Sequence, residues 1–180
     1  MEKIIYRSTA NPTVTKLDKL VDLFKVSDWD QIVWLSIAHS TFTTKFAFPP
    51  PLAEIYITNC ENTHFLSQLP KTIRFVEIKN CYLSDASELF TQEQIAIETV
   101  NLSYNQLKSV PNNLPANLVS IDLSNNSIAK LQETRCFPQN IQRIDLSYNS
   151  LVDLPEWFPD LGDWVNVSLM PNKFWFNAYS

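Results

Sequence analysis

Hydrophobic residues recur along most of the chain in one short pattern. Seven segments fit the template LxxLxLxxNxL when any aliphatic or aromatic residue is accepted at the L positions. The segments begin at Ile32, Leu52, Ile73, Ile97, Leu118, Ile141 and Trp164. Their starts are 20, 21, 24, 21, 23 and 23 residues apart, and the only polar exception at an L position is Asn62. This regularity predicts a repeat protein in which each segment forms one coil.

Within each segment, apolar and polar residues alternate with the period of a β-strand. Val100-Asn101-Leu102 and Ile144-Asp145-Leu146 are two examples. We expect the aliphatic residues of each strand to face a core and the polar residues to face outward. One strand per coil, each followed by a connection to the next coil, predicts a parallel sheet.

The pattern resembles the leucine-rich-repeat family over about residues 32–174, and the three repeats from Ile97 to Leu151 are nearly ideal. The resemblance implies an α/β fold in a single structural domain. It further implies a right-handed solenoid with one curved parallel sheet on its concave face.

The ninth template position carries a small polar side chain in every segment. We predict a structural polar ladder formed by Ser40, Cys60, Cys81, Asn105, Asn126, Asn149 and Asn172. Buried where each strand turns inward, such side chains satisfy backbone groups that would otherwise cost roughly 1 to 3 kcal/mol each. Cys60 and Cys81 could instead be a redox pair on adjacent coils, but free cysteine packs well and donates weakly, which favours the structural role.

The connections between strands are short, and several place proline directly before the next strand. Examples are Leu69-Pro70, Leu114-Pro115 and Phe137-Pro138. Because proline fixes φ and lacks a donor, we expect 3₁₀ and polyproline structure on the convex side, with little α-helix. The longest connection, residues 84–94, is the exception and has a helix-like order of residues.

Residues 1–31 precede the first repeat and are predicted to cap it, since a solenoid exposes its core at both ends. Leu17, Leu20, Val21 and Phe24 are spaced as one face of a helix, which predicts a short amphipathic helix over about residues 16–25. A helix that binds a partner is the alternative.

Aromatic residues crowd the C-terminal tail, residues 175–180, and the position just before it. Two interpretations remain open for Phe174, Trp175, Phe176 and Tyr179. The rings either fold back over the last coil or form an exposed patch for a partner.

The polar strand positions three and five are presented in register by the predicted sheet. From them we predict a partner-binding surface formed by Trp34, Tyr56, Phe75, Glu77, Asn101, Asp122, Arg143 and Asp145. Exposed aromatic residues dominate binding hot spots, which favours Trp34, Tyr56 and Phe75 as anchors. For Trp34, the alternative is burial beneath the N-terminal cap.

Asp122 and Asp145 are predicted to lie side by side on adjacent strands, where two carboxylates repel by about 3 kcal/mol at an effective dielectric of ~20 before screening. A basic side chain from a partner would relieve this repulsion. Alternatively, both carboxylates are solvated and Arg143, on the same face as Asp145, offsets their charge.

Composition narrows the function classes. The chain has 45% hydrophobic and 18% charged residues, which is typical of an ordered globular protein. Its net charge of -5 and the absence of a basic run disfavour nucleic acid as a partner. A single glycine in 180 residues excludes the glycine-rich nucleotide loops. His39 and His64 are isolated, so we expect no catalytic site and no cofactor.

Three cysteines, Cys60, Cys81 and Cys136, are an odd number at spacings that match no zinc motif, so no metal site is predicted. The first residues lack the apolar stretch of a secretory signal, and no apolar run is long enough to span a membrane. We therefore expect a cytoplasmic protein with reduced cysteines and no membrane partner.

These observations predict a non-enzymatic module that binds another protein on the concave face of its sheet. One alternative is a structural subunit of a larger assembly, such as a virion, with self-association through the terminal coils. The second alternative is the recognition domain of an effector enzyme whose catalytic part is absent. The prolines before the strands resemble those of bacterial effector repeats, which favours this second alternative slightly.

Overall fold

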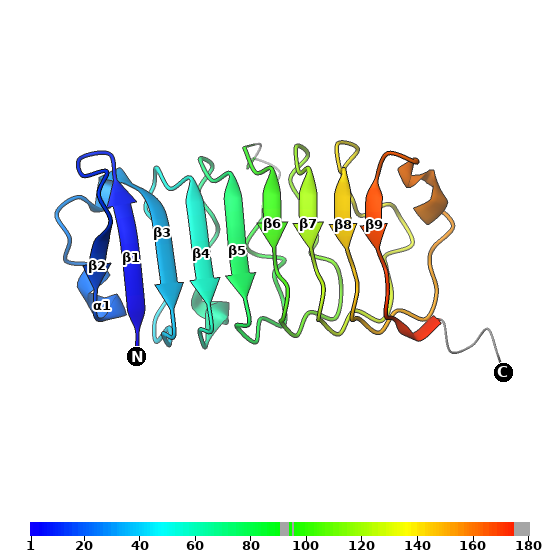
Figure 1. Cartoon of the computed structure of the whole chain (residues 1–180), viewed down its shortest axis with the longest axis horizontal. Helices are drawn as coiled ribbons and strands as arrows, with labels where there is room; N and C mark the ends of the chain where they lie inside the picture. Colours follow the sequence, from blue (N-terminus) through cyan, green and yellow to red (C-terminus); the bar gives the residue numbers. More distant parts are fainter. Residues whose placement is uncertain (91–93, 95, 175–180) are drawn as a thin grey trace.

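The computed structural model describes residues 1–90, 94 and 96–174, and these residues build one long sheet (Figure 1). Nine strands form the sheet in the order β2-β1-β3-β4-β5-β6-β7-β8-β9. Their bounds are Lys3–Ser8 (β1), Thr15–Leu17 (β2), Ile32–Ala38 (β3), Glu54–Thr58 (β4), Phe75–Lys79 (β5), Thr99–Asn101 (β6), Ser120–Asp122 (β7), Arg143–Asp145 (β8) and Asn166–Ser168 (β9).

Strands β3 to β9 run parallel, one in each predicted repeat. The register pairs equivalent template positions, so that Val100 lies between Val76 and Ile121 on the neighbouring strands. The structure therefore confirms the predicted parallel solenoid. We call the side of the sheet that carries template positions three and five its outer face.

The core lies behind the sheet and is continuous from coil to coil. The first template position is fully buried in six coils, at Ile32, Leu52, Ile73, Ile97, Leu118 and Ile141. Burying a large aliphatic side chain contributes roughly 1.5 to 3 kcal/mol, so the repeated aliphatic positions supply the main stabilisation. Each coil buries its apolar residues against the coils on either side. The coils therefore stack one after another along a single axis.

The N-terminal region corrects one prediction. It caps the first coil mainly with β-structure, because β1 pairs antiparallel with β3 and β2 pairs antiparallel with β1. The helix predicted over residues 16–25 is reduced to a single turn, α1 (Leu20–Leu23). Leu17 belongs to β2, where it pairs with Ile4. Pairing with a long strand satisfies the backbone groups of this segment better than a short isolated helix would.

The connections contain few helices. Short 3₁₀ turns occur at Trp29–Gln31, Thr63–Phe65 and Phe158–Leu161. The helix predicted over residues 84–94 is absent from the part that the structure describes up to Phe90; residues 91–93 lie outside the described residues. Asp85 accepts a hydrogen bond from the Ser87 backbone N–H at 2.9 Å, and this local turn competes with helix formation.

The seventh coil departs from the template at its first position. Trp164 was expected to face the core, but its side chain is 70% exposed, and Leu161 is buried instead. Gly162 has φ 92° and ψ 151°, and a Cβ atom there would collide with the Trp164 ring. The only glycine of the chain therefore allows Trp164 to fold back over the backbone.

The aromatic tail, residues 175–180, lies outside the described residues, so neither interpretation of it is tested. Within the described residues, no helix is long and apolar enough to cross a membrane.

Candidate functional site

The predicted polar ladder makes hydrogen bonds between consecutive coils. Asn126 is representative: its Nδ2 donates to the Leu102 carbonyl of the preceding coil at 3.0 Å, and its Oδ1 accepts from the Leu107 N–H at 2.9 Å. Asn105, Asn149 and Asn172 repeat the same two kinds of contact. Each asparagine thus satisfies backbone groups that the tight turns leave without partners.

Cys60 and Cys81 occupy the same positions with thiols. The Cys81 Sγ donates to the Lys79 carbonyl at 3.1 Å and accepts from the Cys60 N–H at 3.4 Å. Both cysteines are fully buried and carry free thiols. A side-chain hydrogen bond with the Cys60 thiol, and then burial, raises the pKa of the Cys81 thiol above its ordinary value, although the hydrogen bond from the Cys60 N–H acts in the opposite direction. The Cys81 thiol is therefore protonated near neutral pH and poorly nucleophilic.

Three aromatic rings form a contiguous row on the outer face at β3, β4 and β5. The Trp34 and Tyr56 ring centroids are 5.6 Å apart, and the Tyr56 and Phe75 rings stack at 4.8 Å. All three side chains are half-buried. We call these three residues the aromatic row. The N-terminal region does not bury Trp34, but the Arg7 guanidinium of β1 lies 4.8 Å from the centroid of its ring.

Carboxylates border the aromatic row. Glu54 accepts a hydrogen bond from the Tyr56 hydroxyl at 3.2 Å. Burial, and then the nearby charge of Glu54, raises the pKa of Tyr56, so its hydroxyl stays protonated. Glu77, on β5, accepts from the Asn101 side chain at 3.1 Å. These contacts fix the side chains beside the rings.

Asn101, Asp122 and Asp145 share a structural role that the sequence analysis missed. The Oδ1 atom of each accepts a hydrogen bond, at 2.9 Å, from the backbone N–H two residues later. This contact closes the turn after the strand, as short polar side chains commonly do. The register also places Asp122 beside Asp145.

Arg143 is exposed, and no ion pair among the described residues joins it to Asp145. Arg143 therefore lies on the same face as Asp145 without a direct ion pair, and the alternative of solvated carboxylates beside Arg143 stays open. Within the part of the chain that the structure describes, no ion pair involves Arg143, Asp122 or Asp145.

Comparisons with known proteins agree with this geometry. Residues 140–161 match the family model described as Leucine Rich Repeat. The fold is that of a leucine-rich-repeat solenoid. Among solved structures, the LRR domain of a Shigella effector has 21% identity and a TM-score of 0.52, over 70% of this chain and 52% of that domain. YopM from Yersinia enterocolitica WA-314 has 21% identity and a TM-score of 0.50, over 71% of this chain and 31% of that protein.

This leucine-rich-repeat chain thus spans about half of the Shigella domain and about a third of YopM. A comparison with curated proteins finds no match.

The eighth position of the repeat has a conformation that sequence analysis did not anticipate. His39, Asn59, Asn80, Tyr104, Asn125 and Tyr148 all have φ between 52° and 56°. Glycine is the usual residue there, but the only glycine of this chain is elsewhere. Asparagine tolerates this left-handed conformation, whereas a bulky residue such as Tyr148 is held in it at a cost of roughly 1–2 kcal/mol.

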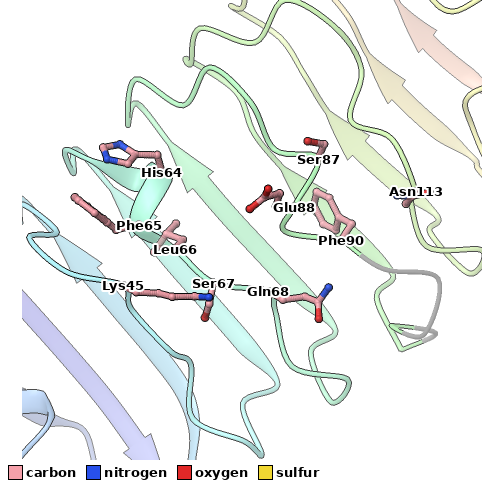
Figure 2. Close-up of a pocket in the computed structure, with 10 residues that line it drawn as sticks. All are labelled: Lys45, His64, Phe65, Leu66, Ser67, Gln68, Ser87, Glu88, Phe90 and Asn113. Carbon is pink, nitrogen blue, oxygen red and sulfur yellow. The ribbon is translucent and has the colours of Figure 1, made fainter.

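The side of the solenoid opposite the sheet carries an open groove of about 810 Å³ (Figure 2). Figure 2 shows that Lys45, His64 and Glu88 reach it from three separate connections. The His64 ring contacts Phe65, with centroids 4.2 Å apart. No group of three His, Cys, Asp or Glu side chains within the described part of the repeat is placed to hold a metal ion. We therefore assign the candidate site to the outer face.

Arg7 and the other outer-facing residues of β1 are missing from the set predicted from sequence. The segment Lys3–Ser8 does alternate, with Ile4, Tyr6 and Ser8 buried and Arg7 exposed. This alternation could have predicted a strand at Lys3–Ser8 from the sequence. It does not indicate which strand β1 pairs with.

Proposed function

We propose that this leucine-rich-repeat chain is a non-enzymatic protein–protein interaction module that binds its partner on the concave, outer face of the sheet. The observation that supports this proposal is the aromatic row of Trp34, Tyr56 and Phe75. Large rings held in one geometry lose little conformational entropy when a partner binds, and aromatic residues are enriched in hot spots.

The scaffold supports this proposal because it fixes the surface before binding. The three rings come from the longest parallel strands, and each ring contacts the next. Glu54, Glu77 and Asp122 add directional acceptors around them, with Glu54 and Glu77 already oriented by hydrogen bonds. Such a mixture of apolar centre and polar surroundings is typical of protein interfaces.

The recognition domain of a longer effector is a second candidate function. It is supported by the fold similarity to a Shigella effector LRR domain, of which this chain covers 52%. In that case the outer face would select the target and another domain would act on it. Both candidates predict that the same face binds protein.

The proposal is tested by affinity capture with three forms of the full chain as bait. The face variant, Tyr56→Ala/Phe75→Ala, removes two rings of the aromatic row. The control variant, Tyr82→Ala/Tyr148→Ala, removes two exposed tyrosines that lie outside the strands. Circular dichroism checks that all three forms are folded. We expect wild type and control to retain the same partner and the face variant to lose it by about tenfold or more. Equal capture by the face variant would refute the proposal.

We also propose a cytoplasmic location, because buried free thiols at Cys60 and Cys81 suit a reducing compartment. Alkylation of freshly lysed cells, followed by mass spectrometry, would find these cysteines unoxidised. Oxidised cysteines, or recovery of the protein outside the cell, would contradict this location.

A further inference from the structure

Strands β1 and β2 extend the outer face beyond the repeats and add basic residues to it (Figure 1). The register continues the template rows: Arg7 pairs with Trp34 in the row of position three, and Lys16 pairs with Ile5 in the row of position five. Lys3 pairs with Ala38 in the row of position seven. Lys3, Arg7 and Lys16 are all exposed. One end of the outer face is therefore basic.

The other end of the outer face is acidic. Asp122 and Asp145 lie on β7 and β8 in the row of position five. Across the described chain, no ion pair involves either aspartate or any of the three basic residues of β1 and β2. The aromatic row lies between these two ends, on β3, β4 and β5. The outer face thus has a basic end, an aromatic centre and an acidic end.

We propose that the partner of this face is a second copy of the chain. In the proposed dimer the two outer faces meet about a two-fold axis that runs parallel to the strands, between β4 and β5. The inference rests on the proposed function, since it requires that this face binds protein. It is carried by the charge complementarity that this one axis produces.

Rotation about this axis reverses the strand order and keeps each template row opposite itself. Strand β2 then faces β8 of the second copy, and Lys16 lies opposite Asp145. Strand β1 faces β7, so that Lys3 and Arg7 lie on either side of Asp122. Opposite charges across an interface fix its register and speed association. Each of these five charges meets a group of opposite sign, while the same rotation also brings Arg143 near Lys16 and Glu54 near Glu77 of the second copy, which are pairs of like charge.

The centre of the dimer holds aromatic rings together with Glu54 and Glu77, which lie on β4 and β5 in the same rows. Strand β4 of one copy faces β5 of the other, so the stacked Tyr56 and Phe75 rings of the two copies meet near the axis.

Other axes give worse arrangements. An axis perpendicular to the strands would place the basic end of one copy on the basic end of the other. A shift of the axis onto β5 would place Arg7 opposite Arg143, because both lie in the row of position three. With the axis between β4 and β5, Arg143 faces the position of Val14, which is uncharged and 51% exposed. Of the three axes compared, only the one between β4 and β5 avoids placing like charges directly opposite one another.

The size of the face predicts a weak dimer. Nine strands spaced about 4.8 Å apart, with about five residues each, cover roughly 38 Å by 16 Å, or about 600 Å² per copy. This area is below the ~800 Å² per partner of a standard interface. We expect a concentration-dependent dimer that weakens as salt screens the charges at its ends.

The test is a charge exchange measured by sedimentation velocity on the full chain. Variant A is Arg7→Glu/Lys16→Glu, and variant B is Asp122→Lys/Asp145→Lys. Each variant alone places like charges opposite one another, so its dimer should weaken by at least about 100-fold. An equimolar mixture of A and B should dimerise, as should one chain that carries all four changes. A control with the same charge change as A, Lys45→Glu/Lys108→Glu, should dimerise like wild type.

Variant B also removes two hydrogen bonds that close turns, at Ser124 and Ser147. If B fails to fold, Asp122→Asn/Asp145→Asn replaces it, because Asn101 makes the same hydrogen bond as an amide. This variant should weaken the wild-type dimer by about tenfold and reduce its salt dependence.

Two results would overturn the inference. One is a wild-type chain that is monomeric at every concentration and salt level tested. The other is a dimer that A does not weaken, or that mixing A with B does not restore. Neither result affects the proposed function, which fails separately if the loss of Tyr56 and Phe75 leaves capture of another protein unchanged.

Discussion

Asn149 connects its own coil to the preceding one: its Nδ2 donates to the Leu123 carbonyl at 2.9 Å, and its Oδ1 accepts from the Ile128 N–H at 2.9 Å. The same side chain also donates to the Leu146 carbonyl of its own coil at 3.1 Å. One amide therefore satisfies backbone groups of two coils that the sheet itself leaves without partners.

Replacing Asn149 with alanine should lower the free energy of unfolding by about 1 to 3 kcal/mol, because the Ile128 N–H loses its partner, while the Leu123 carbonyl keeps its hydrogen bond from Asn126. Urea denaturation followed by circular dichroism measures this loss. The matched control is Asn140→Ala. Asn140 is exposed and its side-chain hydrogen bonds are 3.5 Å long. We therefore expect its free energy of unfolding to change by no more than about 0.5 kcal/mol. Equal losses for the two variants would show that the ladder adds nothing to stability.

Gly162→Ala should destabilise the protein by about 1 to 3 kcal/mol, because its φ of 92° and ψ of 151° suit glycine alone. The added methyl group would also collide with the Trp164 ring. Trp164→Ala alone should have a small effect, since that side chain is 70% exposed. In a double-mutant cycle, the second substitution should recover part of the loss. A strictly additive cycle would mean that the ring does not lie against the glycine.

Tyr148→Asn should raise the free energy of unfolding by about 0.5 to 1 kcal/mol, because asparagine tolerates the left-handed conformation better than tyrosine. Tyr148→Ala is the control, because alanine removes the same ring but does not favour the left-handed conformation as asparagine does. The difference between the two variants in guanidinium denaturation isolates the backbone effect. If alanine is as stabilising as asparagine, the ring and not the backbone is responsible.

Stability should fall at alkaline pH through the half-buried thiol of Cys136. Burial raises the pKa of Cys136 to about 12, whereas an unfolded thiol ionises near ~8.5. The folded state therefore prefers the protonated thiol, and its stabilising contribution is complete below pH ~8.5 and is lost as the pH rises towards 12.

Cys136→Ala should remove this dependence, so that wild type loses about 2 kcal/mol relative to the variant between pH 7 and pH 10.5. Urea midpoints measured at pH 7, 9 and 10.5 test this difference. Parallel curves for the two proteins would contradict it. Any cavity left by the smaller side chain is independent of pH and only shifts the whole curve.

The parallel part of the fold could be predicted from the sequence because each coil repeats the same local pattern. Val100, Ile121 and Ile144 occupy one template position, and the template itself fixes their register. The pairing of β1 with β3 could not be predicted in this way, since it joins Lys3 to Ala38 across a long stretch of chain. Leu17 and Leu20 also matched a helical period, but pairing with β1 places Leu17 in β2 and leaves only the turn α1 at Leu20.

The same distinction between the local repeat pattern and non-local strand pairing applies to the candidate site. Trp34, Tyr56 and Phe75 follow from the template positions, so sequence alone could group them. Arg7 could not be added, because its place beside Trp34 depends on the non-local pairing of β1. Similarly, the turn-closing role of Asp145 depends on the geometry of the residues after β8, which the hydrophobic pattern does not describe.

The ladder has a consequence for how such a chain can change in length. Asn105, Asn126, Asn149 and Asn172 each form hydrogen bonds only within their own coil and the one before it. A coil between two of them could therefore be duplicated or deleted as a unit, with its amide rejoining an equivalent neighbour. Gain or loss of one coil would lengthen or shorten the exposed sheet by about 4.8 Å, and so alter the size of partner that it accommodates.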